Sequence, residues 1–148
     1  MADIPDFDST VSIVAANKPT KDFYNWIKKI GDFASAWKSY MPTVSANTGT
    51  ITSYTSTATF KQMGKTIFVQ IQVTITNAGT AGGNINVSLP VPAPASPVQV
   101  ISGREGAVTG KSLEGIIAGN NCAVVYYDNT FPGATGSQLN LGGTYQAA

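Results

Sequence analysis

The densest group of side chains able to recognise a ligand lies late in the chain, in the stretch YYDNTF. The group comprises Tyr126, Tyr127, Asp128, Asn129 and Phe131, and it spans the end of a predicted strand and the loop that follows. Aromatic faces beside a carboxylate and an amide suit the recognition of a sugar or of a protein surface. The alternative interpretation is that one tyrosine belongs to the core and that the loop is ordinary.

A second candidate is Arg104, the only arginine, which is followed directly by Glu105. Gly103 and Gly106 flank this pair and predict a turn. A guanidinium group can bind a ligand carboxylate through two parallel hydrogen bonds. A salt bridge, within the chain or between subunits, is the competing interpretation. Together with the YYDNTF group, Arg104 and Glu105 form the predicted receptor-binding set.

Catalytic chemistry is poorly supported. The chain has no histidine, which removes the commonest general base and metal ligand. Beyond Pro42 the acids are Glu105, Glu114 and Asp128 only, a density too low to indicate a hydrolytic carboxylate pair. Cys122, the single cysteine, begins a strand and is predicted to be a small buried residue rather than a reactive thiol. We therefore expect no enzyme activity, no cofactor and no metal site.

The element that must organise these loops is the stretch KTIFVQIQVTIT, residues 65–76. One face of this strand is aliphatic throughout, and the other carries mainly amide and hydroxyl groups, because side chains alternate along a strand. The aliphatic face requires a second layer over it. Short segments with turn signals every 8 to 12 residues follow as far as the carboxyl end, as in many β-sandwiches. The predicted fold is a mainly β, jelly-roll-like β-sandwich over residues 42–148.

One helix is predicted, over residues 19–41. Thr20 can cap it and Asp22 suits its positive end. Bulky apolar residues recur at spacings of three and four, as in a coiled-coil seam: Phe23, Trp26, Ile30, Phe33, Trp37 and Tyr40. The helix could pack on its own β-domain or form a parallel bundle with copies of itself. The regular spacing favours the bundle, and wide seam residues favour three strands, so these residues are the predicted trimerisation set.

Residues 1–18 are predicted to form an extended arm, because Pro5 and a cluster of Asp, Ser and Thr oppose a helix. Scattered apolar residues in this arm have nothing of their own to bury against. They are predicted to anchor the chain to a partner: Ile4, Phe7, Val11 and Ile13. The alternative is a frayed terminus. The acidic start is not a secretory signal, and no apolar run is long enough to span a membrane.

Charge is scarce and unevenly placed. Only 11% of the residues are charged, and the net charge is +1, which gives no electrostatic case for binding nucleic acid or an anionic membrane. Most charged residues precede Pro42, so an attachment region and a β-domain are predicted to meet there. Low surface charge is a solubility risk for a monomer and a smaller one inside an assembly.

The order of these pieces resembles the C-terminal domain of tailed-bacteriophage fibre proteins and related minor virion proteins. The likeness covers most of the chain from Trp37 onward and is carried by residues 37–44, 57–69, 79–81, 87–90, 103–105 and 141–145. It implies a homotrimer displayed on a virion, made in the host cytoplasm, and attached to other virion proteins by its amino-terminal segment. Two functions remain open: a fibre that binds a host-surface receptor or glycan, and a structural decoration of the capsid, collar or baseplate.

Overall fold

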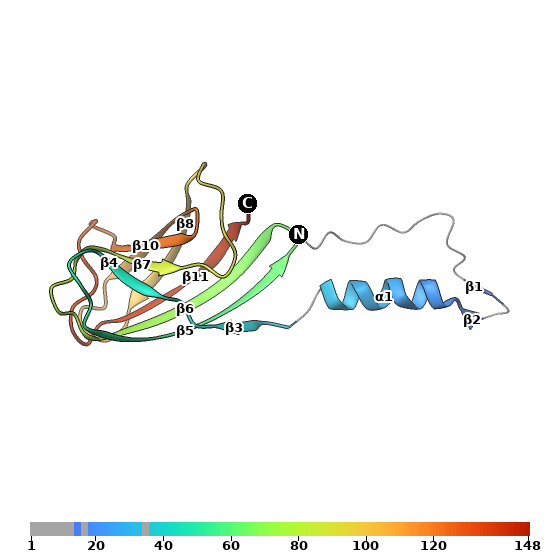
Figure 1. The fold of residues 1–148 in the computed structure, drawn as a ribbon, viewed down its shortest axis with the longest axis horizontal. Helices are drawn as coiled ribbons and strands as arrows, with labels where there is room; N and C mark the ends of the chain where they lie inside the picture. The colour runs from blue at the N-terminus through green and yellow to red at the C-terminus, as the bar shows by residue number, and fades with distance from the viewer. Residues whose placement is uncertain (1–13, 16–17, 34–35) are drawn as a thin grey trace. The chain divides into compact units, whose positions relative to one another are not determined.

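The computed structural model describes residues 14–15, 18–33 and 36–148. The chain divides into two compact units, Met1–Ala36 and Trp37–Ala148, and each is described by itself. The described residues are mainly β-strand with one short helix (Figure 1). The predicted anchor residues Ile4, Phe7, Val11 and Ile13 lie outside the described residues.

The first unit holds the helix. Strands β1 (Val14–Ala15) and β2 (Lys18–Pro19) pair antiparallel, and helix α1 (Lys21–Phe33) follows. The hydroxyl of Thr20 accepts a hydrogen bond from the backbone N–H of Phe23 at 3.2 Å, which confirms the predicted cap. Asp22 lies in the first turn, where the helix dipole favours negative charge.

The helix is shorter than predicted, because it ends at Phe33 rather than near residue 41. Trp37 and Tyr40 belong to the second unit, and Tyr40 lies in strand β3 (Lys38–Tyr40), which pairs with β5. The Tyr40 ring meets Phe60 edge-on with 5.7 Å between ring centroids. Aromatic residues favour strands, and Gly31 weakens the helix before them. Pairing with the sheet therefore overrides the three-four spacing, and Trp37 and Tyr40 do not extend the helical seam.

The second unit is one curled antiparallel sheet of nine strands, in the order β3-β5-β6-β11-β8-β9-β10-β7-β4. The remaining strands are β4 (Val44–Thr48), β5 (Ser53–Met63), β6 (Thr66–Asn77), β7 (Gly82–Ser88), β8 (Gln99–Glu105), β9 (Ser112–Ala118), β10 (Asn121–Tyr126) and β11 (Gln138–Gln146). In Figure 1, β4, β7 and β10 lie across the curl from β5 and β6.

The two edge strands of this sheet, β3 and β4, are consecutive in the chain, so residues 41–43 join its ends. The hydroxyl of Ser56 on β5 donates to the backbone carbonyl of Pro42 at 2.7 Å. The backbone N–H of Val44 donates to the hydroxyl of Tyr54 at 3.1 Å. These contacts hold the start of β4 against β5 and fix the curl.

The core lies inside the curl and follows the predicted alternation of β6. The aliphatic side chains of that strand are all buried: Ile67, Val69, Ile71, Val73 and Ile75. Ile85 and Val87 of β7 and Val124 of β10 complete the core from the opposite side. The mainly β fold is thus confirmed, while the division into a two-sheet jelly-roll sandwich stays a prediction. None of the described helices is both long and apolar enough to cross a membrane.

Candidate binding surface

The two predicted recognition loops lie beside each other. The carboxylate of Asp128 contacts the ammonium of Lys111 at 3.0 Å, and the hydroxyl of Thr109 donates to that of Tyr126 at 3.0 Å. Lys111 also lies 5.2 Å from the ring centroid of Tyr126 and 5.8 Å from that of Tyr127. Residues 107–111 and 126–131 therefore form one surface feature, although Thr109 and Lys111 were not among the predicted residues.

Glu105 is not a surface residue, and residues 103–105 of the predicted turn Gly103–Gly106 form the end of strand β8. The Glu105 side chain is 0% exposed. Its carboxylate accepts hydrogen bonds from the backbone N–H groups of the following loop and of β11: Ala107, Val108, Thr109, Gly110 and Gln138. The glycines around it suggested a turn, but pairing of β8 with β9 and β11 decides the strand.

The charge of Glu105 is held by these donors rather than by a cation. Burial raises its pKa, but backbone hydrogen bonds from Thr109, Gln138, Ala107 and Val108 lower it by more, so the pKa lies well below the usual 4.5. A carboxylate that accepts so many backbone bonds folds the loop 106–111 around itself. Glu105 is thus a structural residue and is unavailable to a receptor.

Arg104 is exposed and lies on β8, paired in register with Asn140 of β11 and Ser112 of β9. Consecutive strand residues face opposite sides, so Arg104 and Glu105 do not act together. The predicted pair is therefore split by the strand, with the guanidinium on the outer face and the carboxylate inside.

The YYDNTF group is divided between core and surface. Tyr126 is buried, and Phe131 is half-buried against the core. Tyr127 is 63% exposed, and Asp128 and Asn129 are exposed. Asn129 has a φ of 59°, which a tight turn requires and Asn tolerates. Tyr127, Asp128 and Asn129 are thus the members of the group that a partner can reach.

The charges in this loop satisfy each other. Hydrogen bonds from Thr130 and then Lys111 lower the pKa of Asp128 to about 2. The hydrogen bond to Asp128 raises the pKa of Lys111. Both groups are charged at neutral pH, and each already has a partner. A ligand here would meet an ion pair and one exposed ring rather than an unsatisfied charge.

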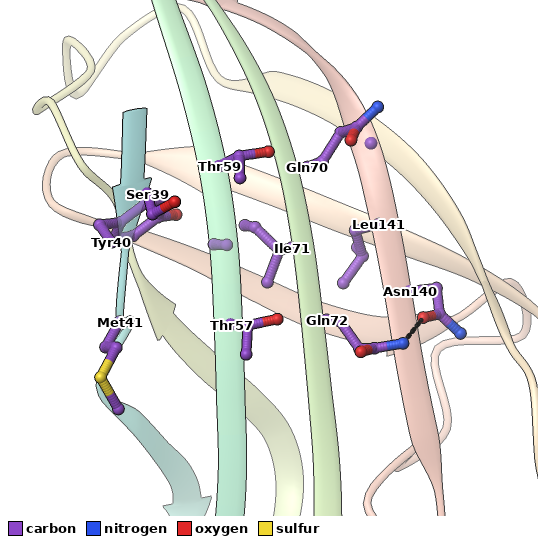
Figure 2. A pocket seen from close by; sticks show the side chains of 12 residues that line it. Ser39, Tyr40, Met41, Thr57, Thr59, Gln70, Ile71, Gln72, Asn140 and Leu141 are labelled. Carbon is purple, nitrogen blue, oxygen red and sulfur yellow. Dashed lines mark hydrogen bonds between the residues drawn. The ribbon is translucent and has the colours of Figure 1, made fainter. Parts of the chain in front are cut away.

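A hollow of about 850 Å³, which sequence reasoning missed, lies over β3, β5, β6 and β11 (Figure 2). Its polar side chains are Ser39, Thr57, Thr59, Gln70, Gln72 and Asn140. Met41 and Gly142 complete the exposed or half-exposed lining. Tyr40, Ala58, Ile71 and Leu141 also line the hollow, and alternation directs their side chains toward the other face.

Strand register assembles this lining. Thr57 of β5 pairs with Gln72 of β6, which pairs with Asn140 of β11. The side-chain amide of Gln72 donates to the side-chain oxygen of Asn140 at 2.9 Å (Figure 2). The sequence did show that one face of β6 is amide and hydroxyl. It did not show which distant residues lie beside that face.

The three acids of the β unit are not arranged as a hydrolytic pair. Glu105 faces the core, Glu114 is exposed on β9, and Asp128 is bonded to Lys111. Across the part of the chain that the structure describes, no three metal-ligating side chains form a cluster. What the lining of the hollow offers chemically is neutral hydrogen bonding and contact with exposed apolar groups.

Comparison with known proteins assigns no family. No protein-family model matches the chain, and no curated protein or solved structure matches it. The resemblance to phage fibre domains therefore stays a prediction from the sequence.

Proposed function

We propose that this chain is a bacteriophage virion fibre protein, a homotrimer attached by its amino-terminal segment and displaying the β-domain to a host-surface receptor or glycan. The observation that carries the proposal is the division of the chain into a helical unit and a separate compact β unit at residue 36. A fibre needs this division, because one part must hold the particle and the other must be displayed. The arm residues Ile4, Phe7, Val11 and Ile13 are assigned to the contact with other virion proteins.

Exposed apolar groups on α1 support assembly through the helix. Tyr24 is 68% exposed and Ile27 is 48% exposed. The rings of Phe23 and Trp26 stack with 6.0 Å between their centroids. Ile30, one turn later on the predicted seam, is half-exposed. Burial of such side chains between copies would gain about 25 cal/mol per Å² of apolar area. We assign trimerisation to Phe23, Trp26 and Ile30 of this helix, with Phe33 added from the sequence pattern alone and without the two residues that belong to the β unit.

The β unit supports surface binding rather than catalysis. Its outer face carries the uncharged hollow and the exposed Tyr127–Asn129 turn. Loops and hollows of this type recognise ligands by shape and hydrogen bonding. We propose binding without chemical conversion, and no cofactor is required.

We also propose that the curled sheet is a jelly-roll-like sandwich. Support comes from the apposition of β4, β7 and β10 with β5 and β6 across one continuous core, and from the ties between Pro42–Val44 and β5. An experimental structure of the assembled protein tests this description, and a sheet that opens between β3 and β4 would contradict it.

The decisive experiment adds the purified full chain to host cells and measures both binding and competition with phage adsorption. We expect saturable binding and a dose-dependent loss of adsorption. The Tyr127→Ala variant tests the contribution of the exposed turn, and Val98→Ala, an exposed apolar residue outside both loops, serves as its control.

If the protein instead decorates the virion without binding the host, the opposite results are expected. Particles that lack the protein would adsorb normally and become fragile, and the purified chain would neither bind cells nor compete. That result would replace the fibre proposal with a structural role in capsid, collar or baseplate.

A further inference from the structure

We propose that the hollow over β3, β5, β6 and β11 is the ligand site of the β unit and that it takes a neutral oligosaccharide. This inference rests on the proposed function, since it names the ligand class and the site of the host-surface contact. It moves the site away from the Arg104–Glu105 and Tyr126–Phe131 stretches to which the sequence pointed.

Gly142 of β11 lines the hollow and lacks a side chain that would fill it. It lies inside β11, paired with Gln70 of β6 and Ser102 of β8, where a glycine weakens a strand. Its φ is outside the left-handed region, and a Cβ at this position would meet nothing closer than 3.8 Å. Neither backbone nor packing requires glycine here. The missing side chain does keep the hollow open, and a strand glycine often marks close approach of a ligand.

The neighbouring glycine shows the contrast. A Cβ at Gly143 would lie 2.7 Å from a side-chain carbon of Ile101, so packing against the core excludes a larger residue there. Gly143 is therefore explained by the fold, while Gly142 is explained by the space that it leaves on the outer face.

The lining is the second argument. The hollow has no charged residue, and its polar groups are hydroxyls and side-chain amides that both donate and accept. The bond between Gln72 and Asn140 orients both amides before any ligand arrives. Within this lining, a phosphate, sulfate or uronate would find no cation to pair with. The hydroxyls of an uncharged sugar can both donate to and accept from these hydroxyl and amide side chains.

The size of the hollow and the groups at its edge also suit a sugar. A volume of about 850 Å³ lies within the range of ligand pockets. Met41 lines the hollow and is 82% exposed, so an apolar group is available to the C–H face of a sugar ring. A second copy of the chain is the main competing occupant. Sedimentation of the Gly142→Val variant distinguishes this occupant from a sugar.

The test uses the full chain and host cells, so that the glycan need not be identified beforehand. Cells are left untreated, digested with protease, or oxidised with periodate, which cleaves the vicinal diols of sugars. We expect wild-type protein to bind untreated and protease-treated cells equally and to lose at least tenfold in binding after periodate.

Gly142→Val fills the hollow and should abolish binding, while a valine in place of a strand glycine should raise the melting temperature. Thr144→Val is the matched control, because Thr144 is exposed on the same face of the same strand, outside the hollow. It should bind as wild type does. Gln72→Ala is the second variant, and it should weaken binding at least tenfold with the fold intact.

The outcomes separate this inference from the proposed function. If wild-type protein binds cells but Gly142→Val and Gln72→Ala bind equally well, the site is elsewhere and only this inference fails. Loss of binding after protease instead of periodate overturns the glycan in favour of a protein receptor. A change of oligomeric state in Gly142→Val, seen by sedimentation, would show that the hollow is an interface between copies. If wild-type protein binds no cells, the proposed function fails and this inference fails with it.

Discussion

At the scale of single residues, Glu105 stands out as a charged side chain of the β unit that is fully buried. A buried carboxylate is costly unless it is paired or well hydrogen-bonded. Here the backbone of residues 107–110, with Gln138 from β11, supplies the bonds. The residue joins the end of β8, the following loop and β11 at one point.

Glu105→Gln should destabilise the fold by about 3 kcal/mol, because an amide offers one acceptor oxygen and places its own N–H donors against backbone donors. Urea denaturation followed by the circular dichroism of the sheet measures this. Glu114→Gln is the matched control, since Glu114 is exposed on β9, and it should stay within about 0.5 kcal/mol of wild type. Equal stability of the two variants would contradict the assigned role of Glu105.

Stability should also fall in acid because of Glu105. Its pKa is lowered in the folded chain, so the unfolded chain takes up the proton first. The contribution is complete above the ordinary pKa of 4.5 and is lost progressively as the pH falls below it. The difference in unfolding free energy between wild type and Glu105→Gln should therefore shrink as the pH is lowered from 6 toward 3. A constant difference over that interval would count against an ionised, hydrogen-bonded carboxylate.

Cys122 should be inert in the native protein. It is buried on β10, and burial raises the pKa of its thiol to about 12, so almost no thiolate exists near neutral pH. A thiol reagent at pH 8 should label the native chain far more slowly than the chain in urea. Cys122→Ala should fold and assemble with a loss of about 1 kcal/mol. Rapid labelling under native conditions would show that β10 opens readily.

At the scale of elements, the boundary between helix and strand is decided by pairing. The spacing of apolar residues from Phe23 to Tyr40 fits a helix throughout, yet β3 takes Tyr40 into the sheet beside Phe60. The spacing of apolar residues reports only how well a segment would form an amphipathic helix. It does not report the pairing of β3 with β5 or the packing of Tyr40 on Phe60, which depend on residues distant in the sequence.

The shorter helix should still hold the subunits together. Trp26→Ala combined with Ile30→Ala should shift sedimentation equilibrium from trimer toward monomer, since each loss of a large buried side chain costs about 3 kcal/mol. Lys28→Ala, an exposed position on the same helix, is the control and should leave the trimer intact. A stable monomer for the unmodified chain would refute assembly through α1.

At the scale of the whole molecule, the shortage of charge determines how binding can work. With a net charge of +1 and an uncharged hollow, long-range attraction contributes little to encounter with a surface. Affinity at each site must come from short-range hydrogen bonds and apolar contact. Three copies would raise a weak affinity by about 10² to 10⁴ through multivalent attachment.

Cell binding should therefore be nearly independent of salt. Raising sodium chloride from 50 to 500 mM screens charge interactions but leaves neutral hydrogen bonds in place. We expect less than a twofold change in apparent affinity. A tenfold fall would point to Arg104 or Lys111 as the main contact, and Arg104→Gln would then reproduce the fall at low salt.

The sequence by itself determined the features that depend on near neighbours in the chain. The alternation of β6 predicted its buried face, and Thr20 predicted the start of α1. The side-chain period of a strand and the capping of a helix are local properties, so a short stretch carries all the information needed.

Only the tertiary structure decided the features that join distant residues. Gln72 and Asn140 meet because β6 pairs with β11, and Glu105 is buried because β8 lies between β9 and β11. The sequence pointed to Arg104, Glu105 and the YYDNTF loop because their side chains are distinctive. The hollow is built from common Thr, Ser, Gln and Gly residues, and only strand register brings them together, because pairing partners cannot be read from either strand alone.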